Sequence, residues 1–425
     1  MSNLVQKWGP ILDHPDFAPI KDSYRKHVTA VLLENQEKAL QEERGQGYLN
    51  EAHTNIAGNV QNFDPVLISL VRRTAPNLMA YDTMGVQPLT LPTGLIFAMK
   101  SKYGTGATGP LSSTEALFNE ANTGWGGTGT HDADVVGNIT ASGATGLSAY
   151  GGFGTGITLA TAEGAAPNTM GFTIDRVTAT AVTRQLAADY SLELAQDLKN
   201  VHNLDADSEI SNILSAELMA EMNRESTRTI YKVAKYGAQA NTTNAGGFDL
   251  DSDSDGRWSV ERFKGLVFQA EREANQIAKG TRRGKGNFLI CSSDVASALA
   301  MAGKLDYAPA MSTDLAVDDT GNTFAGTLNG KYKVFIDPYF SSGSSVYTDI
   351  MVVGYKGSNA YDAGLFYCPY VPLTMVRAVD PLTFQPRIGF KTRYAIVSNP
   401  LGGDGATLGA QSNAYYRKVL ISNLL

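Results

Sequence analysis

Glycine is concentrated in one stretch of this chain, and that stretch constrains the fold more than any other feature. The sequence has 425 residues and 43 glycines, a share above the roughly 7% of average proteins. Residues 101–170 hold 15 of these glycines but only six charged side chains. Small residues with wide backbone freedom favour turns and extended ribbons. The low charge predicts a ribbon lying on another surface, with a disordered loop as the alternative.

Two predicted strands bracket this glycine-rich segment. The outgoing strand is GLIFAMKSKY at 94–103, and the returning strand is MGFTIDRVTATAVTRQL at 170–186, in which apolar and polar residues alternate. The simplest geometry is a long two-stranded hairpin that carries the segment as an insert at its tip.

The strongest helix is predicted at 205–236. Asp205 can cap its start, Lys232 and Lys235 lie in its last turn and Gly237 follows, so both ends match the helix macrodipole. At 1.5 Å per residue the helix spans roughly 45 Å. Its apolar stripe comprises Ile210, Ile213, Leu214, Leu218, Met222, Ile230 and Val233.

Other helices and short strands fill the rest of the chain. We expect a charged amphipathic helix over 21–44, and another over 259–279 with Ser259 as its cap and Gly280 as its stop. A further helix is predicted to begin at Asp64-Pro65 and to end before Pro76. The later predicted elements are strands at 287–292, 331–336, 349–355, 364–379 and 390–400, and a helix at 294–303. The fold class is therefore α+β, with one rod-like helix and one hairpin arm.

Charge and cysteine content narrow the class of protein. The formal net charge is -7, from 35 basic and 42 acidic residues, which argues against a basic surface that coats DNA. Two cysteines cannot make a disulfide framework and fit a reducing compartment. No apolar run approaches the roughly 20 residues of a membrane span, and the N-terminus lacks the pattern of a signal peptide. We expect a soluble protein assembled in the cytoplasm, with no membrane partner.

Two motifs suggest ligand chemistry but match it poorly. Gly104-x-Gly106-x-x-Gly109 follows a strand, as in a dinucleotide-binding fingerprint, and a short helix over SSTEALFNEA is possible after Pro110. No second parallel strand with a ribose-binding acid follows clearly. Asp251-x-Asp253-x-Asp255-Gly256 matches half of a calcium loop, but Arg262 stands at position 12 and Glu261 is one place early. A solvated acidic turn is the preferred interpretation.

The remaining candidates favour a structural role. GTRRGKGNF at 280–288 lacks the phosphate-loop spacing and precedes its strand, so we expect a basic surface turn that pairs with acids of a neighbouring subunit. Cys291 and Cys368 lie in apolar strands and are expected to be buried. The five histidines show no pair at metal-ligand spacing; they are His14, His27, His53, His131 and His202. We expect no catalytic residue, no cofactor and no metal.

Long motifs spread over nearly the whole chain resemble one family. They include VRRTAPNLMAYDTMGVQPLTLPTGLIFAMKSKYG, YSLELAQDLKNVHNLDADSEISNILSAELMAEMNRE, VGYKGSNAYDAGLFYCPYVPL and FQPRIGFKTRY. In order and content they resemble the major capsid protein of T-even myoviruses, which are tailed bacteriophages. The resemblance fails at about 104–169, where members of that family carry a folded insertion domain.

The resemblance implies the fold shared by tailed phages of the Hong Kong type and herpesviruses. In that fold a spine helix crosses a peripheral domain, an extended arm overlaps a neighbouring subunit, and an axial domain meets its copies around the capsomer axis. The implied divisions are a scaffold-associated segment at 1–51, an N-terminal arm at 52–84, an extended arm at 85–190 with its insert at about 104–169, a peripheral domain at 191–264, an axial domain at 265–360, and a return to the peripheral domain at 361–425.

The family also loses its N-terminal segment to a prohead protease that cuts after Glu in a Leu/Ile-x-Glu pattern. Leu49-Asn50-Glu51 matches within a flexible polar joint, so we expect the cut between Glu51 and Ala52. Leu32-Leu33-Glu34 and Leu40-Gln41-Glu42 also match, but inside a predicted helix. Residues 1–51 carry six basic and eight acidic residues, so their removal changes the net charge from -7 to -5.

The function implied is self-assembly of hexameric capsomers into an icosahedral or prolate head that encloses DNA without reading its sequence. The implied partners are further copies of the chain, an internal scaffold, the prohead protease, and vertex and decoration proteins. The implied location is the virion capsid, after assembly in the cytoplasm of the bacterial host. The alternatives are a vertex or decoration protein of the same family, and an oxidoreductase that uses Gly104–Gly109.

Overall fold

The chain folds into two compact units in a computed structural model. Unit 1 comprises residues 1–96 and 177–425, and unit 2 comprises residues 97–176. The structure describes residues 2–14, 20, 22–45, 72, 78–104, 111–118, 120–129, 154–164, 166–240, 242–254, 256, 258–303, 305–307, 324–340, 347–379, 385–401 and 408–424. Within them, no helix is long and apolar enough to cross a membrane.

A four-stranded sheet forms the first part of unit 1, in the order β1-β13-β14-β5. Its strands are β1 (Gly85–Val86), β13 (Leu365–Val379), β14 (Pro386–Ser398) and β5 (Val182–Asp189). β13 and β14 form a long antiparallel pair that runs from Leu365↔Ser398 to Val379↔Pro386. Helix α3 (Ser23–Gly45) packs against β13, and helix α8 (Ala206–Val233) packs against β14 and β5. Side chains from both helices join one buried core with Tyr367, Phe390 and Tyr394.

An eight-stranded sheet forms the second part of unit 1. Its order is β6-β15-β12-β8-β11-β10-β9, and β7 also pairs with β15. The strands are β6 (Ala234–Tyr236), β7 (Gly247–Asp249), β8 (Phe288–Ser292), β9 (Leu305–Tyr307), β10 (Phe324–Leu328), β11 (Tyr332–Asp337), β12 (Asp349–Gly354) and β15 (Asn413–Ser422). Helices α9 (Ser259–Thr281) and α10 (Ser293–Met301) pack on it. β15 therefore shares a sheet with the strands at 288–354 and not with β13 and β14, with which the expected 361–425 division grouped it.

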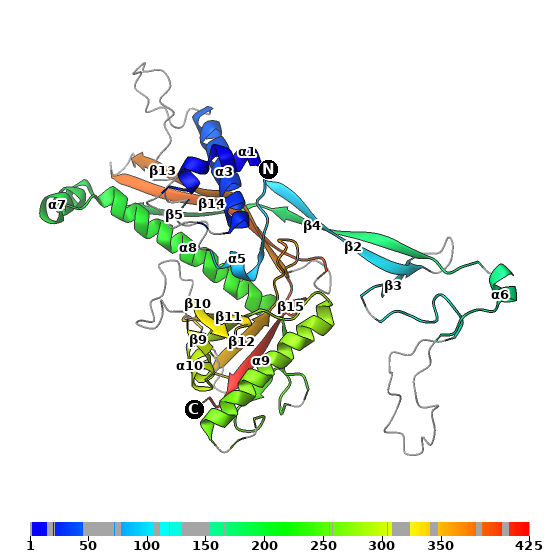
Figure 1. Ribbon diagram of the computed structural model, residues 1–425. Helices are drawn as coiled ribbons and strands as arrows, with labels where there is room; N and C mark the ends of the chain where they lie inside the picture. The colour runs from blue at the N-terminus through cyan, green and yellow to red at the C-terminus, as the bar shows by residue number, and fades with distance from the viewer. Residues whose placement is uncertain are drawn as a thin grey trace. The chain divides into compact units, whose positions relative to one another are not determined.

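The predicted long helix is α8 (Ala206–Val233), which we call the spine helix (Figure 1). The predicted end was wrong. The helix stops at Val233, because residues 234–236 extend as β6 and pair with β15. Lys235 is therefore in a strand, and Gly237 follows that strand. The predicted stripe is buried at Leu214, Leu218, Met222, Ile230 and Val233, but Ile213 is 65% exposed.

The other helices of unit 1 follow the predictions with local corrections. Helix α3 (Ser23–Gly45) is confirmed, and it lies beside the short α1 (Ser2–Lys7) and α2 (Gly9–Leu12). Helix α9 begins at Ser259, so the N-cap position is Trp258 and not Ser259, and Trp258 makes no side-chain capping hydrogen bond. It also continues through Gly280 and ends at Arg282, whose φ of 53° is left-handed. Of the helix predicted from Asp64-Pro65 to before Pro76, the structure describes Arg72, which is helical, and the other residues lie outside the described part. Short α5 (Ala80–Thr83) precedes β1.

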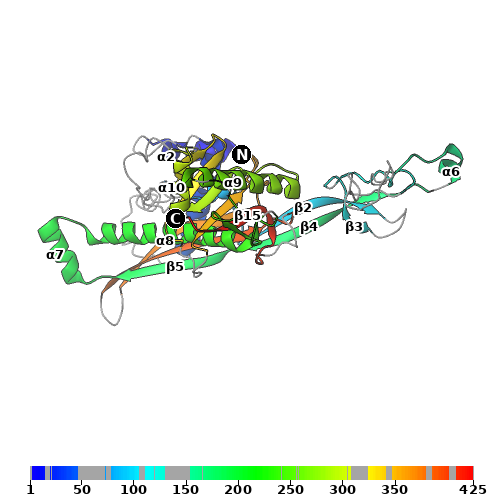
Figure 2. The same cartoon turned by 90° about the horizontal axis from the view of Figure 1, so that it is seen from below.

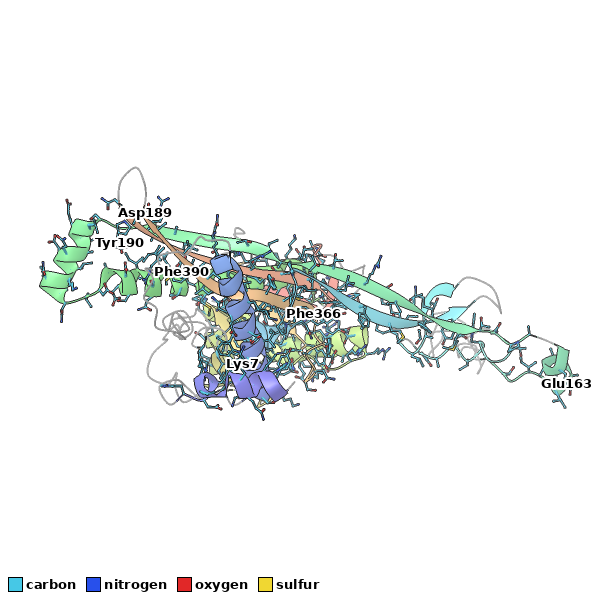
Figure 3. All side chains as sticks on the ribbon, turned by 90° about the horizontal axis from the view of Figure 1, so that it is seen from above. Lys7, Glu163, Asp189, Tyr190, Phe366 and Phe390 are labelled. Atoms are coloured by element: carbon cyan, nitrogen blue, oxygen red, sulfur yellow. The ribbon has the colours of Figure 1, made fainter. Side chains whose placement is uncertain are left out.

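Unit 2 contains most of the predicted hairpin. Strands β2 (Thr93–Gly104) and β4 (Met170–Thr180) lie side by side in a sheet of order β3-β2-β4, with β3 at Leu111–Glu115 (Figure 1). The returning strand is interrupted at Ala181, whose N–H donates to the carbonyl of Pro92 over 2.9 Å, and the chain continues as β5. The described insert residues include α6 (Leu159–Gly164), which carries Glu163 (Figure 3).

Candidate assembly interfaces

The spine helix is tied to the four-stranded sheet by a cluster of charges. Arg184 of β5 contacts Glu221 at 2.5 Å and Glu225 at 2.8 Å, both on α8. The hydroxyl of Tyr394 on β14 also donates to the Glu225 carboxylate. One arginine therefore joins two successive turns of the spine helix to the sheet, which keeps α8 aligned along the strands.

A second cluster ties the spine helix to the eight-stranded sheet. Arg224 Nη1 lies 2.6 Å from both carboxylate oxygens of Asp337, at the end of β11. The Tyr231 hydroxyl donates to the same carboxylate over 2.8 Å, and the Tyr339 N–H donates to it over 3.0 Å. The Asp337 side chain is only 4% exposed, so its charge depends on these donors.

We expect Arg224→Met to lower the free energy of unfolding by about 3 kcal/mol, because it leaves a buried carboxylate without its cation. Chemical denaturation of the purified chain measures this loss. A matched control is Arg387→Met, which removes an ion pair with Asp189 whose two side chains are about half exposed. That exposed pair should contribute little. If both substitutions lowered the free energy of unfolding equally, Arg224 would not be the cation that stabilises the buried Asp337 carboxylate.

The N-terminal helices are built into the core of unit 1. Helix α3 buries Val28, Leu32 and Leu33 in the same cluster as the spine helix. The Asn35 side-chain amide donates to the carbonyls of Leu89 at 2.8 Å and Tyr370 at 2.9 Å. This segment is therefore a packed part of the folded subunit and not a loose tail.

The three candidate cleavage motifs differ in their surroundings. Leu49, Glu51 and Ala52 lie outside the described residues. Leu32 and Leu33 are buried, and Glu34 is held by Lys7 Nζ at 2.8 Å (Figure 3 labels Lys7). Leu40-Gln41-Glu42 lies within α3. Because a protease must extend its substrate backbone, the two motifs inside α3 are poor sites in the folded subunit.

A polar cavity of about 510 Å³ lies between α3 and the body of unit 1. Its lining includes Arg25 and Lys333, which both contact Asp82 at 3.0 Å, and the half-buried Lys356. Lys356 donates to the carbonyl of Tyr81. Burial lowers the pKa of Lys356 to about 8, a shift that the nearby Asp82 partly opposes.

The lowered pKa of the half-buried Lys356 predicts a pH dependence of stability. The pKa of Lys356 is lower in the folded chain than its ordinary value of 10.5. Above about pH 8, Lys356 has therefore lost its proton in the folded chain but keeps it in the unfolded chain, so the unfolded chain binds more protons than the folded chain. The free energy of unfolding should therefore increase between about pH 8 and about pH 9.5, below the range in which ordinary tyrosines titrate. Denaturation of Lys356→Met should show a smaller increase over the same range. An unchanged slope would contradict the assignment.

The hairpin of unit 2 exposes an apolar face. Phe97 is 73% exposed and Phe172 is 64% exposed. Met99, Met170 and Ile174 are also more than half exposed, and all five lie at alternate positions of β2 and β4. Lys100 and Asp175, which occupy the intervening positions, form an ion pair of 2.9 Å across the two strands. The apolar side chains therefore gather on the opposite face, which we call the arm face.

Sequence reasoning missed the arm face, although the pattern contains it. In β4 the predicted alternating residues change parity, because Phe172 and Ile174 are even-numbered whereas Val177 and Ala179 are odd-numbered. A strand with period two turns these pairs to opposite faces. Val177 and Ala179 belong to a small core of unit 1, and Ala179 is fully buried. The change of parity marks the point at which the apolar residues of β4 change from the covered face of the strand to its uncovered face.

The dinucleotide interpretation fails at Gly104. Its N–H donates to the Thr169 carbonyl over 2.8 Å, and an added Cβ would lie 2.5 Å from the Thr169 hydroxyl. This glycine therefore allows two strands to approach each other. The following described segment is strand β3, which pairs antiparallel with β2, and not the helix considered after Pro110. Gly106 and Gly109 lie outside the described residues.

Two carboxylates of the acidic turn have hydrogen-bond or ion-pair partners within the chain. Asp253 accepts from the Thr243 N–H at 2.7 Å and the Asp249 N–H at 3.0 Å, and Arg262 contacts Asp251. The arginine thus stands where a calcium loop needs a carboxylate, as the sequence indicated. Within the described part of the chain, no group of three or more potential His, Cys, Asp or Glu ligands is placed to hold a metal.

The basic turn at 280–288 pairs partly within its own chain. Lys285 contacts Glu271 of α9 and lies over the ring of Tyr332, which differs from the expected contact with a neighbour. Gly286 packs closely against Val353 and Ala274, so the turn is compact. Both cysteines are buried as predicted, and burial raises the pKa of each thiol to about 12. The described histidines, His14, His27 and His202, are scattered.

The chain is similar over most of its length to known capsid proteins. The family described as Major capsid protein Gp23 matches residues 60–421. The major capsid protein of Salmonella phage ViI is 39% identical over 99% of this chain and 98% of its own length. That of Enterobacteria phage T4 is 34% identical over 100% of this chain and 99% of its own length. A solved structure titled "The capsid of Myoviridae Phage XM1" covers 80% of this chain and 91% of its own, with 8% identity and a TM-score of 0.40.

The sequence relatives define the class as capsid proteins of tailed phages. This chain belongs to the Gp23 family of major capsid proteins, which confirms the resemblance found in its motifs. It is a component of the virion capsid. Its α+β architecture, with a spine helix and a hairpin arm, agrees with the capsid fold expected from that resemblance.

The vertex alternative has a weaker relative. The capsid vertex protein of Enterobacteria phage T4 is 26% identical over 54% of this chain and 53% of its own length. Major capsid proteins match at 34% and 39% over essentially the whole chain. The comparisons therefore favour the major capsid protein over the capsid vertex protein.

Proposed function

We propose that this chain builds the shell of a phage head by self-assembly into hexameric capsomers that enclose the DNA genome. The observation that carries this proposal is the uncovered arm face. Five large apolar side chains on adjacent strands stay exposed in the single chain, and such contiguous patches mark interaction surfaces. In a shell of identical subunits, a neighbouring copy is the natural cover. The negative net charge of -7 limits sticking to the enclosed DNA.

The two sheets of unit 1 support a division of the subunit into two domains. The four-stranded sheet with the spine helix would form the peripheral domain, and the eight-stranded sheet with α9 and α10 would form most of the axial domain. Arg184 and Arg224 hold the spine helix to one sheet each. The chain works by geometry and interface area, and many modest contacts between copies stabilise a closed shell. No catalytic step or cofactor is part of this proposal.

Maturation would remove residues 1–51 by a cut between Glu51 and Ala52. The scaffold would contact this segment before the cut, and the prohead protease would make the cut within the host cytoplasm. The support for Glu51 is its match to Leu-x-Glu, together with the burial of Leu33 and the pairing of Glu34 in the competing motif. Vertex and decoration proteins would complete the head.

Expression in bacteria with and without a scaffold and protease, followed by electron microscopy, tests the proposal. We expect hexameric capsomers or closed shells. A stable monomer under all conditions would contradict self-assembly. If the chain instead only bound to preformed shells made by another protein, the result would favour the decoration alternative.

A further inference from the structure

The polar cavity beside α3 carries more positive than negative charge. It lies within unit 1, where the N-terminal helices (blue in Figures 1 and 2) meet α5 and the ends of β8, β11 and β12. Its volume of about 510 Å³ falls within the about 300–1,000 Å³ of small-molecule sites. Four basic and two acidic side chains line it, a net charge of +2 when all are ionised; they are Arg25, Lys331, Lys333, Lys356, Asp22 and Asp82.

The two carboxylates do not balance the four cations. Asp82 is shared by Arg25 and Lys333, which each contact one of its oxygens at 3.0 Å. Asp22 lies 3.8 Å from Arg25 Nε, and its side chain is 54% exposed. Among the described residues, neither carboxylate forms an ion pair with the other two cations of the cavity. The excess positive charge therefore lies on the two remaining lysines.

Lys356 is the cation whose surroundings most favour an added anion. Its ammonium group donates to the backbone carbonyl of Tyr81, which is a neutral acceptor. Burial lowers the pKa of Lys356 to about 8, and neighbouring cations lower it further, whereas nearby carboxylates oppose the shift. A half-buried ammonium group in such surroundings is stabilised by any ligand that brings negative charge. The charged or titratable groups that surround it in the cavity are Asp22, Tyr24, Arg25, Tyr81, Asp82, Lys331 and Lys333.

We propose that this cavity binds a polyphosphate anion of the size of pyrophosphate or triphosphate, either free or as part of a nucleotide. Lysine and arginine form strong charge-assisted hydrogen bonds with phosphate oxygens. The cations come from α3, from β11 and its preceding turn, and from the segment after β12. An anion with several charged groups can contact all three segments at once, whereas a single phosphate would fill a small part of the volume. This site goes beyond the proposed function, and its test needs no assembled shell.

Calorimetric titration of the purified full chain tests the proposal with inorganic phosphate, pyrophosphate, triphosphate and ATP as probes. We expect triphosphate to bind at least about tenfold more tightly than inorganic phosphate, because it can contact more of the cations. If ATP binds no more tightly than triphosphate, the ligand is a free polyphosphate. If ATP binds more tightly, the ligand is a nucleotide.

Substitutions identify the cations that hold the anion. Lys356→Met should weaken triphosphate binding about tenfold or more, since it removes a charge-assisted contact in a partly desolvated site. Lys331→Met should weaken binding several-fold, and it should leave the fold intact because Lys331 is exposed. The matched control is Lys264→Met, which removes an exposed lysine of α9 that does not line the cavity. The control should leave the affinity unchanged.

The pH dependence of binding distinguishes a direct contact of Lys356 from a purely structural role. In the unliganded chain Lys356 has lost most of its proton at pH 9, so binding must first restore that proton. Because the probe itself gains negative charge with pH, the unmodified chain is compared with Lys356→Met. The ratio of their affinities for triphosphate should fall by about tenfold between pH 7 and pH 9, as one pKa unit requires.

Four results would overturn the proposal. They are no measurable binding of triphosphate, an equal loss of affinity in Lys264→Met and Lys331→Met, an affinity ratio that does not change with pH, and equal binding of a short single-stranded DNA, which is too large for the cavity. None of these results depends on whether the chain forms capsomers, so failure of this site and failure of self-assembly are separate outcomes.

Discussion

Phe97→Asp combined with Phe172→Asp should abolish closed shells while the subunit stays folded. Both side chains are more than three-fifths exposed, so their replacement costs the single chain little packing. In a shell, the same positions would place two carboxylates in an apolar contact without partners. Burial of unpaired charges is strongly unfavourable. Electron microscopy of the co-expressed assembly reports the shells, and circular dichroism of the purified subunit reports the fold.

A matched control adds the same charge elsewhere in unit 2. Ala160→Asp and Ala162→Asp place two carboxylates on the exposed helix α6, away from β2 and β4. This variant should assemble normally. Normal shells from the phenylalanine variant would remove the arm face as an assembly surface. Loss of shells from both variants would show that charge alone, and not the apolar face, decides assembly.

Glu51→Gln should block maturation in the presence of the protease. The expected subunit from wild-type particles begins at Ala52, and its net charge is -5 because the lost segment carries -2. The substitution removes the residue after which the cut is made, so the subunit should keep its N-terminus at full length. Mass spectrometry of the subunit from purified particles measures both outcomes directly.

Glu42→Gln is the control for this experiment, since Glu42 completes a competing motif inside α3. It should leave the cut at Glu51 unchanged. A mature subunit that begins at Asn35 or Glu43 would show that the protease opens α3 and would refute the choice of Glu51. Equal processing of Glu51→Gln and the unmodified chain would do the same.

Local signals predicted most helices and strands, whereas contacts distant in sequence decided their ends. The spine helix stops at Val233 because β6 pairs with β15, which is almost two hundred residues away along the chain. The returning strand of the hairpin is divided at Ala181, where its N–H bonds to Pro92 and β5 turns to pair with β14. Neither partner can be identified from a short window of sequence.

The candidate surfaces were harder to predict than the fold. The alternation in β4 indicated a strand, but only the structure shows that Phe172 is uncovered while Ala179 is buried. The apolar stripe of helix α7 (Leu192–His202) is visible as spacing from Leu194 to Val201, yet such a stripe usually marks core. In the folded subunit, however, Leu194 is 50% exposed and Val201 is 73% exposed. Exposure is a property of the whole subunit and not of the segment.

The burial of α3 has a consequence for reversibility. Leu32 and Leu33 belong to the same core as the spine helix, and the Asn35 amide donates to the backbone of Leu89 and of Tyr370 in β13. If maturation discards these residues, the mature subunit has lost part of what directed its folding. A head dissolved in denaturant should then not rebuild itself from mature subunits, whereas subunits with the segment should refold. The mature shell would then be kinetically stable: it would persist because its subunits unfold slowly, and not because folding and assembly are at a reversible equilibrium.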